Sequence, residues 1–531
     1  MTAAPTGTAP AGTPPAAAPT ASSVLLLHPH DSVGVARADL PAGTVVTLDG
    51  GRELPLRADV PRGHKVAVTD VAAGAEVRKY GQVIGRATAD VRAGDHVHVH
   101  NLGMVASRPE HEFGAGAVRP DVLPPEERAV FQGFVRSDGR AATRNYVGIL
   151  TTVNCSATAA KLIARQLQAP GALDGIDGVG SVDGVVALAH GTGCGLAADG
   201  AGLEVLRRTL RGYARHPNFG ALLVLGLGCE VNQISGLLGD LDLPDDRLVV
   251  PMAIQELGGT RRTVAEGVAR IREFVPDVGR AQRRPVPASE LVLGTNCGGS
   301  DGWSGVTANP SLGAAVDELV RHGGTAVLAE TPEVYGAEHL LTRRAVSPQV
   351  AERLLERIRW WERYTADNGG DMDNNPSPGN KAGGLTTILE KSLGAVAKGG
   401  TTALTAVHEY AEPLGEKGFV FMDTPGYDPV SVTGIVAGGA NVVCFTTGRG
   451  SVFGCKPAPS LKLATNSDVY RRMEDDMDVD CGVVLEGTSV EEMGRRIFDL
   501  VLETASGRRT KSEEIGVGDE EFTPWQLGAV M

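Results

Sequence analysis

Four of the seven cysteines stand at the ends of apolar, strand-like segments, where each segment runs into a glycine-rich turn. They are Cys155, Cys194, Cys229 and Cys297. A thiol that only fills space has no reason to favour that position, whereas thiols gathered at strand ends can ligate a metal ion, hold an iron–sulfur cluster or act as reactive groups. The alternative is a need for a small residue where two backbones pass closely. No CxxC spacing decides between the two interpretations.

His190 ends the segment before Cys194, and Glu230 follows Cys229 directly. Imidazole, carboxylate and thiol groups together suit a first-row divalent metal ion or acid–base chemistry. His190 can equally be a turn residue that is satisfied by the backbone. The sequence therefore indicates a polar crevice here without fixing the role of its imidazole.

Half of the twelve histidines lie near the N-terminus. They are His28, His30, His64, His96, His98 and His100. The last three alternate with other residues, which places them on one face of a strand. A shared metal-binding face is one interpretation of this pattern. A solvated strand is the other, and we favour it for His30 and His96.

Two glycine-rich segments have the composition of anion sites. Residues 375–384 (NPSPGNKAGG) precede a helical pattern, so backbone N–H groups and Lys381 could receive a carboxylate. Residues 446–451 (TTGRGS) follow a strand and offer Arg449 as a bidentate clamp. A plain turn is the alternative for each. The GxxxxGK[ST] phosphate loop is absent from the sequence, which disfavours nucleotide hydrolysis.

Polar residues also follow Cys297. Ser300 and Asp301 lie in the turn CGGSDG, and Asn309 lies in GVTANP shortly after it. Hydroxyl, carboxylate and amide groups of this kind are expected around a polyhydroxylated ligand. A further polar cluster follows the next predicted strand and consists of Glu330, Glu333, Glu338 and His339. Surface charge on a helix explains the last two as easily.

The elements that must position these residues begin with an N-terminal β region. Residues 1–22 contain almost only Ala, Pro, Thr and Gly, which predicts a disordered tail. Between 23 and 102 an aspartate is followed four residues later by glycine at Asp39, Asp59, Asp70 and Asp90, at intervals of 20, 11 and 20 residues. This predicts two related halves of an all-β clip whose turn glycines take a positive φ. A proline-rich linker is expected at 103–130.

Beyond residue 130, apolar strand-like segments alternate with helical patterns. The predicted strands are 146–152, 184–189, 221–226, 248–252, 291–294, 326–329, 418–422 and 441–445, and the predicted helices include 157–168, 203–213, 350–361 and 385–396. The alternation predicts an α/β fold with parallel sheets, in which ligands bind beyond the carboxyl ends of the strands. An Asn-Cys pair at 154–155 and again at 296–297 favours two Rossmann-like domains, at 131–288 and 289–531.

The composition excludes several classes of function. Lys+Arg 50 against Asp+Glu 64 gives a net charge of −14, and no basic stripe interleaved with aromatic residues is present, so nucleic acid is not an expected partner. No apolar run reaches the ~18 residues of a membrane span, and the N-terminus lacks a signal-peptide pattern. We expect a cytoplasmic protein without membrane partners or a disulfide framework, and leave a homo-oligomer open.

Taken together, these motifs resemble the altronate/galactarate dehydratase family of sugar-acid dehydratases. The resemblance covers nearly everything from residue 24 to residue 531. Its most specific parts are GLGCE (226–230), CGGSDG (297–302), GVTANP (305–310), NPSPGNKAGG (375–384) and TTGRGS (446–451). The N-terminal β clip looks like the SAF domain of that family.

The resemblance implies removal of water from an aldonic or aldaric acid to give a 2-keto-3-deoxy sugar acid. It also implies Fe²⁺, with Mn²⁺, another divalent metal ion or an iron–sulfur cluster as alternatives. The expected metal ligands, brought together from both parts of the chain, are His28, His64, Cys155, Cys194, Cys229 and Cys297. The expected catalytic residues are His190, which is the first choice for the general base, Cys297 and Lys381. The side chains expected to bind the sugar acid are Ser300, Asp301, Asn309, Lys381 and Arg449.

Three alternatives accompany this interpretation. The segments 95–101 and 336–339 resemble altronate dehydratases more than galactarate dehydratases, so altronate is the expected substrate. Related sulfolactate sulfo-lyases divide the clip and the catalytic part between two polypeptides, unlike this fused chain. A sugar-acid sensor or carrier would bind the ligand without eliminating water, but it would not need so many thiols and imidazoles around one crevice.

Overall fold

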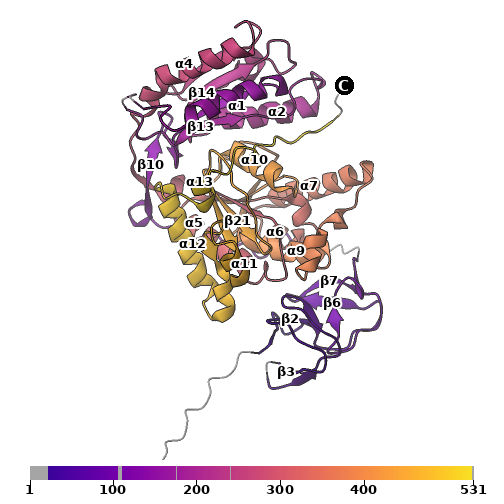
Figure 1. The fold of residues 1–531 in the computed structure, drawn as a ribbon. Coiled ribbons are helices and arrows are strands. Elements are labelled where there is room, and N and C mark those ends of the chain that lie inside the picture. The colour runs from indigo at the N-terminus through magenta and orange to yellow at the C-terminus, as the bar shows by residue number, and fades with distance from the viewer. Residues whose placement is uncertain are drawn as a thin grey trace, which may run out of the picture.

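The computed structural model describes residues 22–48, 50–105, 111–174, 176, 178–239 and 241–528. Apart from Ser22, the predicted disordered tail lies outside these residues. The chain forms an N-terminal β unit, a second unit around a four-stranded sheet and a C-terminal unit around a seven-stranded sheet (Figure 1). Within the described part of the chain, no helix is long and apolar enough to cross a membrane.

The N-terminal unit, which we call the clip, consists of short strands joined by tight turns. Its main sheet is antiparallel and has the order β1-β2-β5-β8, formed by Val24–Leu25, Val33–Ala36, Lys65–Ala67 and His96–Val97. A hairpin of β3 and β4 (Val45–Thr47, Glu53–Pro55) and a sheet of β6, β7 and β9 (Glu76–Lys79, Gln82–Ala87, Leu102–Gly103) complete it. The predicted β character of this region is therefore present.

The repeated aspartates explain how the clip is held together. Asp39 accepts a hydrogen bond from the Arg62 amide, while Asp59 accepts one from the Ala42 amide. The pair Asp70 and Asp90 makes the same reciprocal contacts with the amides of Ala93 and Ala73. The glycine that closes each phrase has a φ of 81°, 80°, 80° and 92° in chain order, as the sequence predicts. The clip thus contains two halves built on one plan.

The second unit is a parallel sheet with helices on both faces. Its strand order is β13-β12-β14-β15, formed by Gly184–Leu188, Tyr146–Thr151, Phe219–Gly226 and Leu248–Ala253. Helices α1 (Asn154–Gln168) and α4 (Thr260–Val278) pack on one face, and α2 (Ala201–Arg215) packs on the other. Strand residues face the two helical layers alternately, which is why the strands read as continuous apolar runs.

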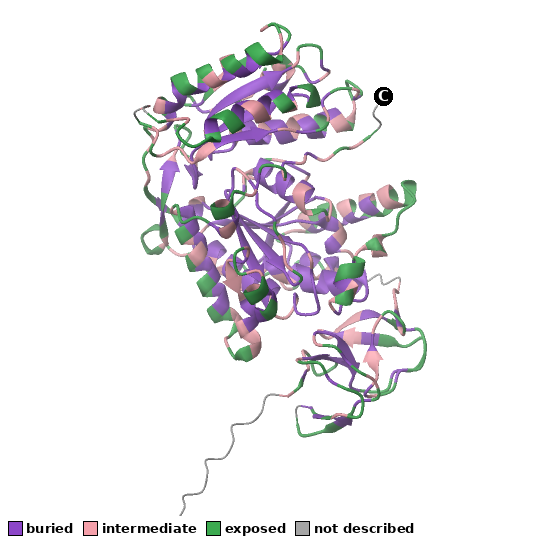
Figure 2. Cartoon of the chain, viewed as in Figure 1, coloured by how far each residue is buried: buried purple, intermediate pink, exposed green. Residues whose placement is uncertain are grey.

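The C-terminal unit carries the larger sheet, whose strands are all parallel and almost fully buried (Figure 2). Its order is β19-β20-β18-β17-β21-β22-β23, formed by Leu404–His408, Gly418–Met422, Thr325–Leu328, Val292–Cys297, Val442–Thr447, Ser460–Ala464 and Val479–Asp480. Helices α5 (Ala308–Arg321) and α12 (Val490–Ala505) pack on one face, and α10 (Asp428–Gly438) packs on the other. Helix α9 (Ile388–Val396) lies beside the clip.

Elements outside the predicted set join these units. Strand β10 (Val130–Val135) pairs antiparallel with β11 (Ala141–Ala142) and with β16 (Arg284–Pro287), so the beginning and the end of the second unit meet. All eight predicted strands are present, whereas β19, β22 and β23 of the larger sheet were not predicted. Other helices of the C-terminal unit are α6 (Glu338–Thr342), α7 (Pro348–Asp367), α8 (Pro378–Ala382), α11 (Ser467–Arg472) and α13 (Lys511–Ile515).

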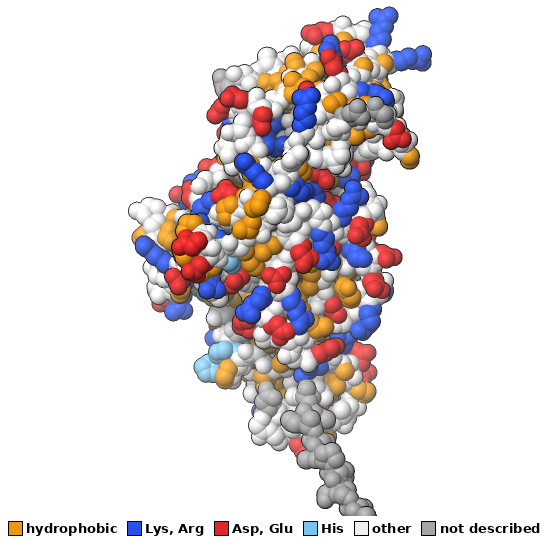
Figure 3. Space-filling model, turned by 90° about the vertical axis from the view of Figure 1, so that its left-hand side faces the viewer, with side chains coloured by type: hydrophobic (Ala, Val, Ile, Leu, Met, Phe, Trp, Pro, Cys, Tyr) orange, Lys and Arg blue, Asp and Glu red, His pale blue; other side chains and the backbone are white. Residues whose placement is uncertain are grey.

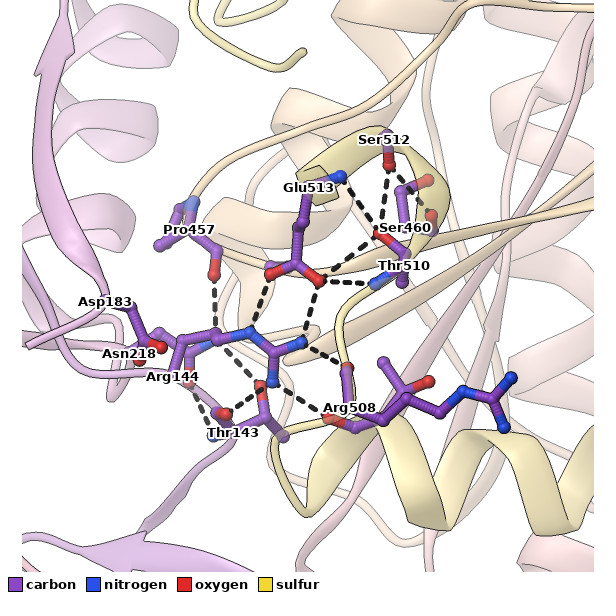
Figure 4. A network of polar contacts seen from close by, with 12 residues as sticks. Thr143, Arg144, Asp183, Asn218, Pro457, Ser460, Arg508, Thr510, Ser512 and Glu513 are labelled. Atoms are coloured by element: carbon purple, nitrogen blue, oxygen red, sulfur yellow. Dashed lines mark hydrogen bonds and ion pairs between the residues drawn. The ribbon is translucent and has the colours of Figure 1, made fainter. Parts of the chain in front are cut away.

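Hydrogen bonds of Arg144 connect the second unit to helices α12 and α13 near the C-terminus (Figure 4). Its guanidinium makes a bidentate pair with Glu513, with distances of 2.6 and 2.8 Å, and donates to the carbonyls of Thr143, Thr504 and Arg508. Every N–H of this buried side chain therefore has an acceptor, which is what a buried charge requires.

A second buried ion cluster anchors the clip to the C-terminal unit. Glu390 of α9 accepts hydrogen bonds from Lys65 at 2.8 Å and from Lys79 at 2.9 Å, and all three side chains are buried. Lys65 also donates to the carbonyl of Gly384. The opposite charges lower the pKa of Glu390 to about 2, although burial opposes this effect. The clip is thus docked through charges that water does not reach.

Candidate functional site

Three acid or thiol side chains meet at the carboxyl edge of the seven-stranded sheet. Cys297 is the last residue of β17, and Glu330 follows the end of the neighbouring strand β18 with a left-handed φ of 70°. Glu333 lies in the short 3-10 helix that comes next, Thr331–Glu333. Because parallel strands end at one edge, side chains distant in sequence come together there.

The donor atoms of Cys297, Glu330 and Glu333 lie within 4.8 Å of one another, and this is the one such group of three among the described residues. The Cys297 thiol is 3.1 Å from Glu333 Oε2 and 3.6 Å from Glu330 Oε2. The Cys297 backbone N–H also donates to Glu330 Oε2. All three side chains are buried.

Two buried lysines oppose these acids. Lys398 Nζ lies 2.7 Å from both Cys297 Sγ and Glu330 Oε2. Lys391 Nζ, from α9, lies 2.6 Å from Glu333 Oε1 and 2.8 Å from Asn375 Oδ1. The two ammonium groups thus balance the two carboxylates in a place that excludes water, as buried charges require.

Burial shifts the protonation equilibria of these groups. It raises the pKa of the Cys297 thiol well above its usual value, and the two neighbouring carboxylates add to this effect. It also raises the pKa of Glu330, despite Lys398. Burial acts the same way on Glu333, but Lys391 and Lys398 outweigh it and hold its pKa below the ordinary range. Glu333 is therefore the carboxylate that stays ionised, and Glu330 the one that is ready to take a proton.

Asp428 adds a half-buried acid at the N-terminal end of α10. Its carboxylate faces Gly298, the residue after Cys297, so closely that a side chain at Gly298 would collide with it. Burial, followed by the charge of Glu333, raises the pKa of Asp428 to about 7. An acid that titrates near neutrality beside this cluster can accept or donate a proton during turnover.

The same group fits a divalent cation. It offers one sulfur and two carboxylates, a mixture that suits first-row divalent metals such as iron. Glu330 Oε1 is buried and has no hydrogen-bond partner. An orphaned carboxylate oxygen inside a protein is costly, and a bound cation would satisfy it.

The predicted sugar-acid loops lie side by side near this edge. Asn380, in the segment 377–384, donates to the Ser300 carbonyl at 2.9 Å, and the Gly302 amide donates to the Gly383 carbonyl at 2.8 Å. A side chain at Gly383 would meet both Asp301 and Arg449. Arg449 is exposed and Lys381 is half-buried, so both cationic side chains can reach a ligand.

Asp301 and Asn309 were predicted to contact hydroxyl groups of the ligand. In the structure their polar atoms form hydrogen bonds with other groups of the protein. Asp301 accepts hydrogen bonds from the side chains of Ser304, Thr465 and Asn466. Asn309 accepts from Thr446 at 2.7 Å and donates to the carbonyl of Gly394. In this structure both residues hold the loops in place.

Part of the predicted histidine face borders these loops. His64 Nε2 lies 3.3 Å from the Ala382 carbonyl, and His98 Nε2 lies 2.9 Å from the Lys381 carbonyl. His64 Nδ1 and His96 Nε2 are 3.0 Å apart. Burial lowers the pKa of His64 and His98, and lowers that of His96 to about 4. These three imidazoles are therefore neutral at pH 7 and lie beside the Lys381 segment.

The remaining predicted residues lie elsewhere, so the six expected metal ligands do not form one site. His28 packs against His30 and Gly81 in the clip. Cys155, Cys194 and Cys229 follow strands of the four-stranded sheet and are exposed. This separation arises because four similar strand ends belong to two different sheets.

His190 also lies apart from Cys297, at the end of β13 in the second unit. Its Nε2 contacts the Thr151 carbonyl at 3.0 Å, and its Nδ1 accepts from the Thr192 amide. Both ring nitrogens are thus engaged by the backbone, the arrangement that the sequence left open as the alternative to a catalytic role.

Sequence reasoning noticed Glu330 and Glu333 but did not assign them, and it missed Lys391, Lys398 and Asp428. The one available signal for the lysines was their position in and just after the apolar segment 385–396. A lysine that faces the core needs a buried counter-charge, and so it points to a buried polar site.

On the face drawn in Figure 3, acidic and basic side chains are interspersed, and neither kind forms a large patch. Histidines of the clip reach the surface, among them His28, His30 and His100. The charges that matter for the site are therefore local ones.

Three family models match the chain. The C-terminal model of D-galactarate/altronate dehydratase matches residues 288–530. The second-domain model of D-galactarate dehydratase/altronate hydrolase matches residues 133–279. The SAF-domain model of altronate/galactarate dehydratase matches residues 22–105.

Full-length relatives show the same similarity. The altronate dehydratase of Escherichia coli (strain K12) is 37% identical over 495 residues, which cover 92% of this chain and 96% of that protein. The altronate dehydratase of Bacillus subtilis (strain 168) is 34% identical, with coverage of 93% and 97%. The galactarate dehydratase (L-threo-forming) of Escherichia coli (strain K12) is 37% identical, with coverage of 93% and 95%.

Proposed function

Because the chain belongs to the D-galactarate/altronate dehydratase family, we propose that it is a hydro-lyase that removes water from a sugar acid, with altronate as the substrate. The product is a 2-keto-3-deoxy sugar acid. The observation that supports this most directly is the buried cluster of Cys297, Glu330 and Glu333 opposite two lysines.

The chemistry requires three kinds of group. A base removes the weakly acidic proton on C2, positive charge stabilises the enediolate that forms, and an acid gives a proton to the C3 hydroxyl so that it leaves as water. The resulting enol then ketonises without help. The cluster contains fixed positive charge, and Asp428 provides an acid–base group beside it.

We assign the general base to Asp428. It is half-buried, it borders the Cys297 turn, and its pKa of about 7 lets it be ionised at neutral pH and still hold a proton well. Lys398 is fully buried with a raised pKa, so it remains an ammonium. Its role is to stabilise negative charge on the substrate rather than to take a proton.

Cys297, Glu330 and Glu333 would hold the divalent cation, for which we propose Fe²⁺. When bound, the cation supplies further positive charge for the enediolate and for the departing hydroxyl. These residues bring two carboxylates and a buried thiol to that task. Lys391 and Asn375 hold Glu333 in position through contacts of 2.6 and 2.9 Å.

Lys381 and Arg449 would bind the carboxylate of the substrate. Lys381 lies in α8 and Arg449 lies on the loop after β21, and Arg449 can form a bidentate pair with a carboxylate. Galactarate is a second candidate, because two cations, one on α8 and one on the loop after β21, also suit a diacid. The segments 95–101 and 336–339 lead us to rank altronate first.

The proposal is tested with the full chain purified without oxygen and loaded with Fe²⁺. Altronate, galactarate and other sugar acids are supplied in parallel, and 2-keto acid is measured. We expect product from altronate and its loss in Asp428→Asn, with the conservative Asp468→Asn on an exposed surface pair as the control. Absence of 2-keto acid with every sugar acid would overturn the proposed function.

A further inference from the structure

The backbone of Glu330 has a conformation that a glutamate rarely adopts. Its φ of 70° and ψ of 64° lie in the left-handed region, and the residue is fully buried. Strain of this kind persists only where the surrounding structure fixes it, and it is concentrated at active sites and ligand clamps. Here the turn places the Glu330 carboxylate against Cys297 and Lys398. The contacts that fix this turn therefore determine the shape of the proposed cation site.

The end of a neighbouring strand supplies those contacts. The Glu330 amide donates to the Thr424 hydroxyl at 2.9 Å, and the Thr331 amide donates to the Thr424 carbonyl at 3.0 Å. The Thr331 hydroxyl donates to Asp423 Oδ1 at 2.5 Å. Asp423 and Thr424 are the first two residues after β20, which pairs with β18. Two adjacent strand ends are thus bonded to each other at the turn that carries Glu330.

Thr331 lies where it can fix both acids of the cluster. It stands between Glu330 and Glu333 in the chain, and the Glu333 amide donates to the Glu330 carbonyl at 2.7 Å. One tight turn therefore carries both carboxylates. Thr331 is itself fully buried. Because a shift of this turn would move both carboxylates at once, the hydrogen bond from Thr331 to Asp423 controls where they stand.

Asp423 is a buried acid that is bonded by neutral donors. The residue is 4% exposed. Both side-chain donors that the described residues offer to it are uncharged: the Thr331 hydroxyl, and the indole N–H of Trp361 at 2.7 Å. Replacing a buried hydrogen-bonded pair by apolar groups of the same shape can be nearly neutral for stability. Packing alone therefore does not explain an acid at this place.

An aromatic stack holds Trp361 in the orientation that its hydrogen bond needs. An indole donates only through Nε1, so the direction of the ring decides whether Asp423 is reached. The rings of Trp361 and Trp525 are stacked, with an angle of 3° and centroids 5.4 Å apart, and Trp360 packs edge-on against both. Trp361 belongs to α7, whereas Trp525 lies in the segment that follows α13. Distant parts of the chain thus support Asp423.

We infer that Asp423 is a positioning residue for the dehydration site, which acts through Thr331 on Glu330 and Glu333 and is itself held by Trp361. The inference rests on the proposed function, because that function requires a divalent cation at these two acids. In this role Asp423 fixes the turn that carries the ligands. Its loss would therefore weaken the binding of the cation before it changes any chemical step.

The test measures the binding of Co²⁺ to the full chain purified without metal, through the visible absorbance that reports the ligands of this ion. We expect Thr331→Val and Asp423→Leu to weaken Co²⁺ binding by about tenfold or more, since each leaves a buried partner unpaired. Thr331→Ser keeps the donor and Asp423→Asn keeps an acceptor, so both should stay within about threefold of the wild type. Trp361→Phe keeps a ring and loses the N–H, so it should weaken binding in the same direction.

Thr152→Val is the matched control, because Thr152 also donates from a buried hydroxyl to a carboxylate, at 2.6 Å to Glu230, but in the second unit. It should lower the urea midpoint of unfolding about as much as Thr331→Val does and leave Co²⁺ binding unchanged. If Asp423→Leu does not fold, Thr331→Val and Trp361→Phe make the same comparison, since neither changes the charge of the core.

Three outcomes would overturn the inference. They are unchanged Co²⁺ binding in Thr331→Val and Asp423→Leu, a loss of binding in Thr152→Val equal to that in Thr331→Val, and no binding of Co²⁺ by the wild type. Formation of 2-keto acid is measured on the same wild-type preparation after loading with Fe²⁺. The expected Co²⁺ pattern without 2-keto acid from any sugar acid would overturn the proposed function and support the role of Asp423, so the two failures are distinguishable.

Discussion

Lys398 is the residue on which the electrostatic argument depends most directly. Its ammonium contacts Cys297 and Glu330 in a place without water. We expect Lys398→Met to lower kcat by about 10²- to 10³-fold, the usual cost of removing one preorganised donor. Steady-state kinetics with altronate is the measurement. The double variant Lys398→Met/Glu330→Gln removes both charges, so no uncompensated buried charge is left to prevent folding. A near-normal kcat in this double variant would contradict the proposed role of Lys398.

Arg449 should act on binding more than on the chemical step. It is exposed on the loop after β21. Hydrogen bonds to charged groups contribute about 1.5–3 kcal/mol, so Arg449→Ala should raise KM about tenfold or more with little change in kcat. Arg471→Ala, at an exposed arginine that pairs with Asp468, is the control. An unchanged KM would remove Arg449 from the substrate site.

Residue types alone predicted part of this site. The sequence placed Cys297, Lys381 and Arg449 at strand ends and loops that the structure brings to the same sheet edge. It did not separate Cys297 from Cys155, because both stand in the same local setting of strand, Asn-Cys and turn. Which sheet a strand joins depends on long-range pairing, and that information is absent from the local pattern.

At the scale of elements, the docking of the clip on α9 rests on Lys65, Lys79 and Glu390. Glu390→Gln leaves two buried ammonium groups without a counter-charge, and breaking such a pair costs about 3–5 kcal/mol. We expect faster hydrogen exchange in β5 and β6 of this variant, measured by mass spectrometry. Replacing all three residues by apolar ones should restore slow exchange, and equally fast exchange in both variants would contradict the account.

His216 gives the junction between the second and C-terminal units a dependence on pH. The Asn218 amide donates to its Nδ1, so Nε2 carries the proton and donates to the Ala440 carbonyl at 2.9 Å. Burial lowers the pKa of His216 to about 3. The unfolded state, with a pKa near ~6.5, therefore binds more protons between these values, and stability falls as the pH falls through that window.

The measurement is the urea midpoint of unfolding between pH 7 and pH 4. His216→Gln keeps a donor for Ala440 and does not titrate, so its midpoint should fall less steeply with decreasing pH than that of the wild type. Each unit of pKa difference corresponds to about 1.4 kcal/mol. Identical slopes for the two proteins would show that His216 does not contribute.

The positions of strands along the sequence were easier to predict than the neighbours with which each strand pairs. The eight predicted strands are long apolar runs, and burial on both faces makes such runs visible in a sequence. Strand β22 was missed because the buried Lys462 interrupts its pattern. Strand β10 pairs antiparallel with β16, which is short and contains two prolines. The positive φ of the clip glycines was predictable, since the aspartate phrase is a local turn signal.

At the scale of the whole molecule, Arg144 connects units that are distant in sequence. Its five N–H groups all have acceptors, among them Glu513. Arg144→Lys keeps the charge but not the planar set of donors, so it leaves buried acceptors unpaired and should destabilise the protein by about 1–3 kcal/mol for each. Thermal unfolding checks this, with Arg140→Lys at an exposed pair as the control. A melting temperature equal to that of the control would contradict it.

The anchoring of the clip has a consequence for how such a protein can be encoded. Buried charges on Lys65, Lys79 and Glu390 hold the clip to α9, so the peptide connection between them is not what keeps the two surfaces in contact. A gene broken within codons 111–124 would then yield two polypeptides that assemble on their own. In such a split protein, both polypeptides would have to be expressed together for Lys65 and Lys79 to meet Glu390.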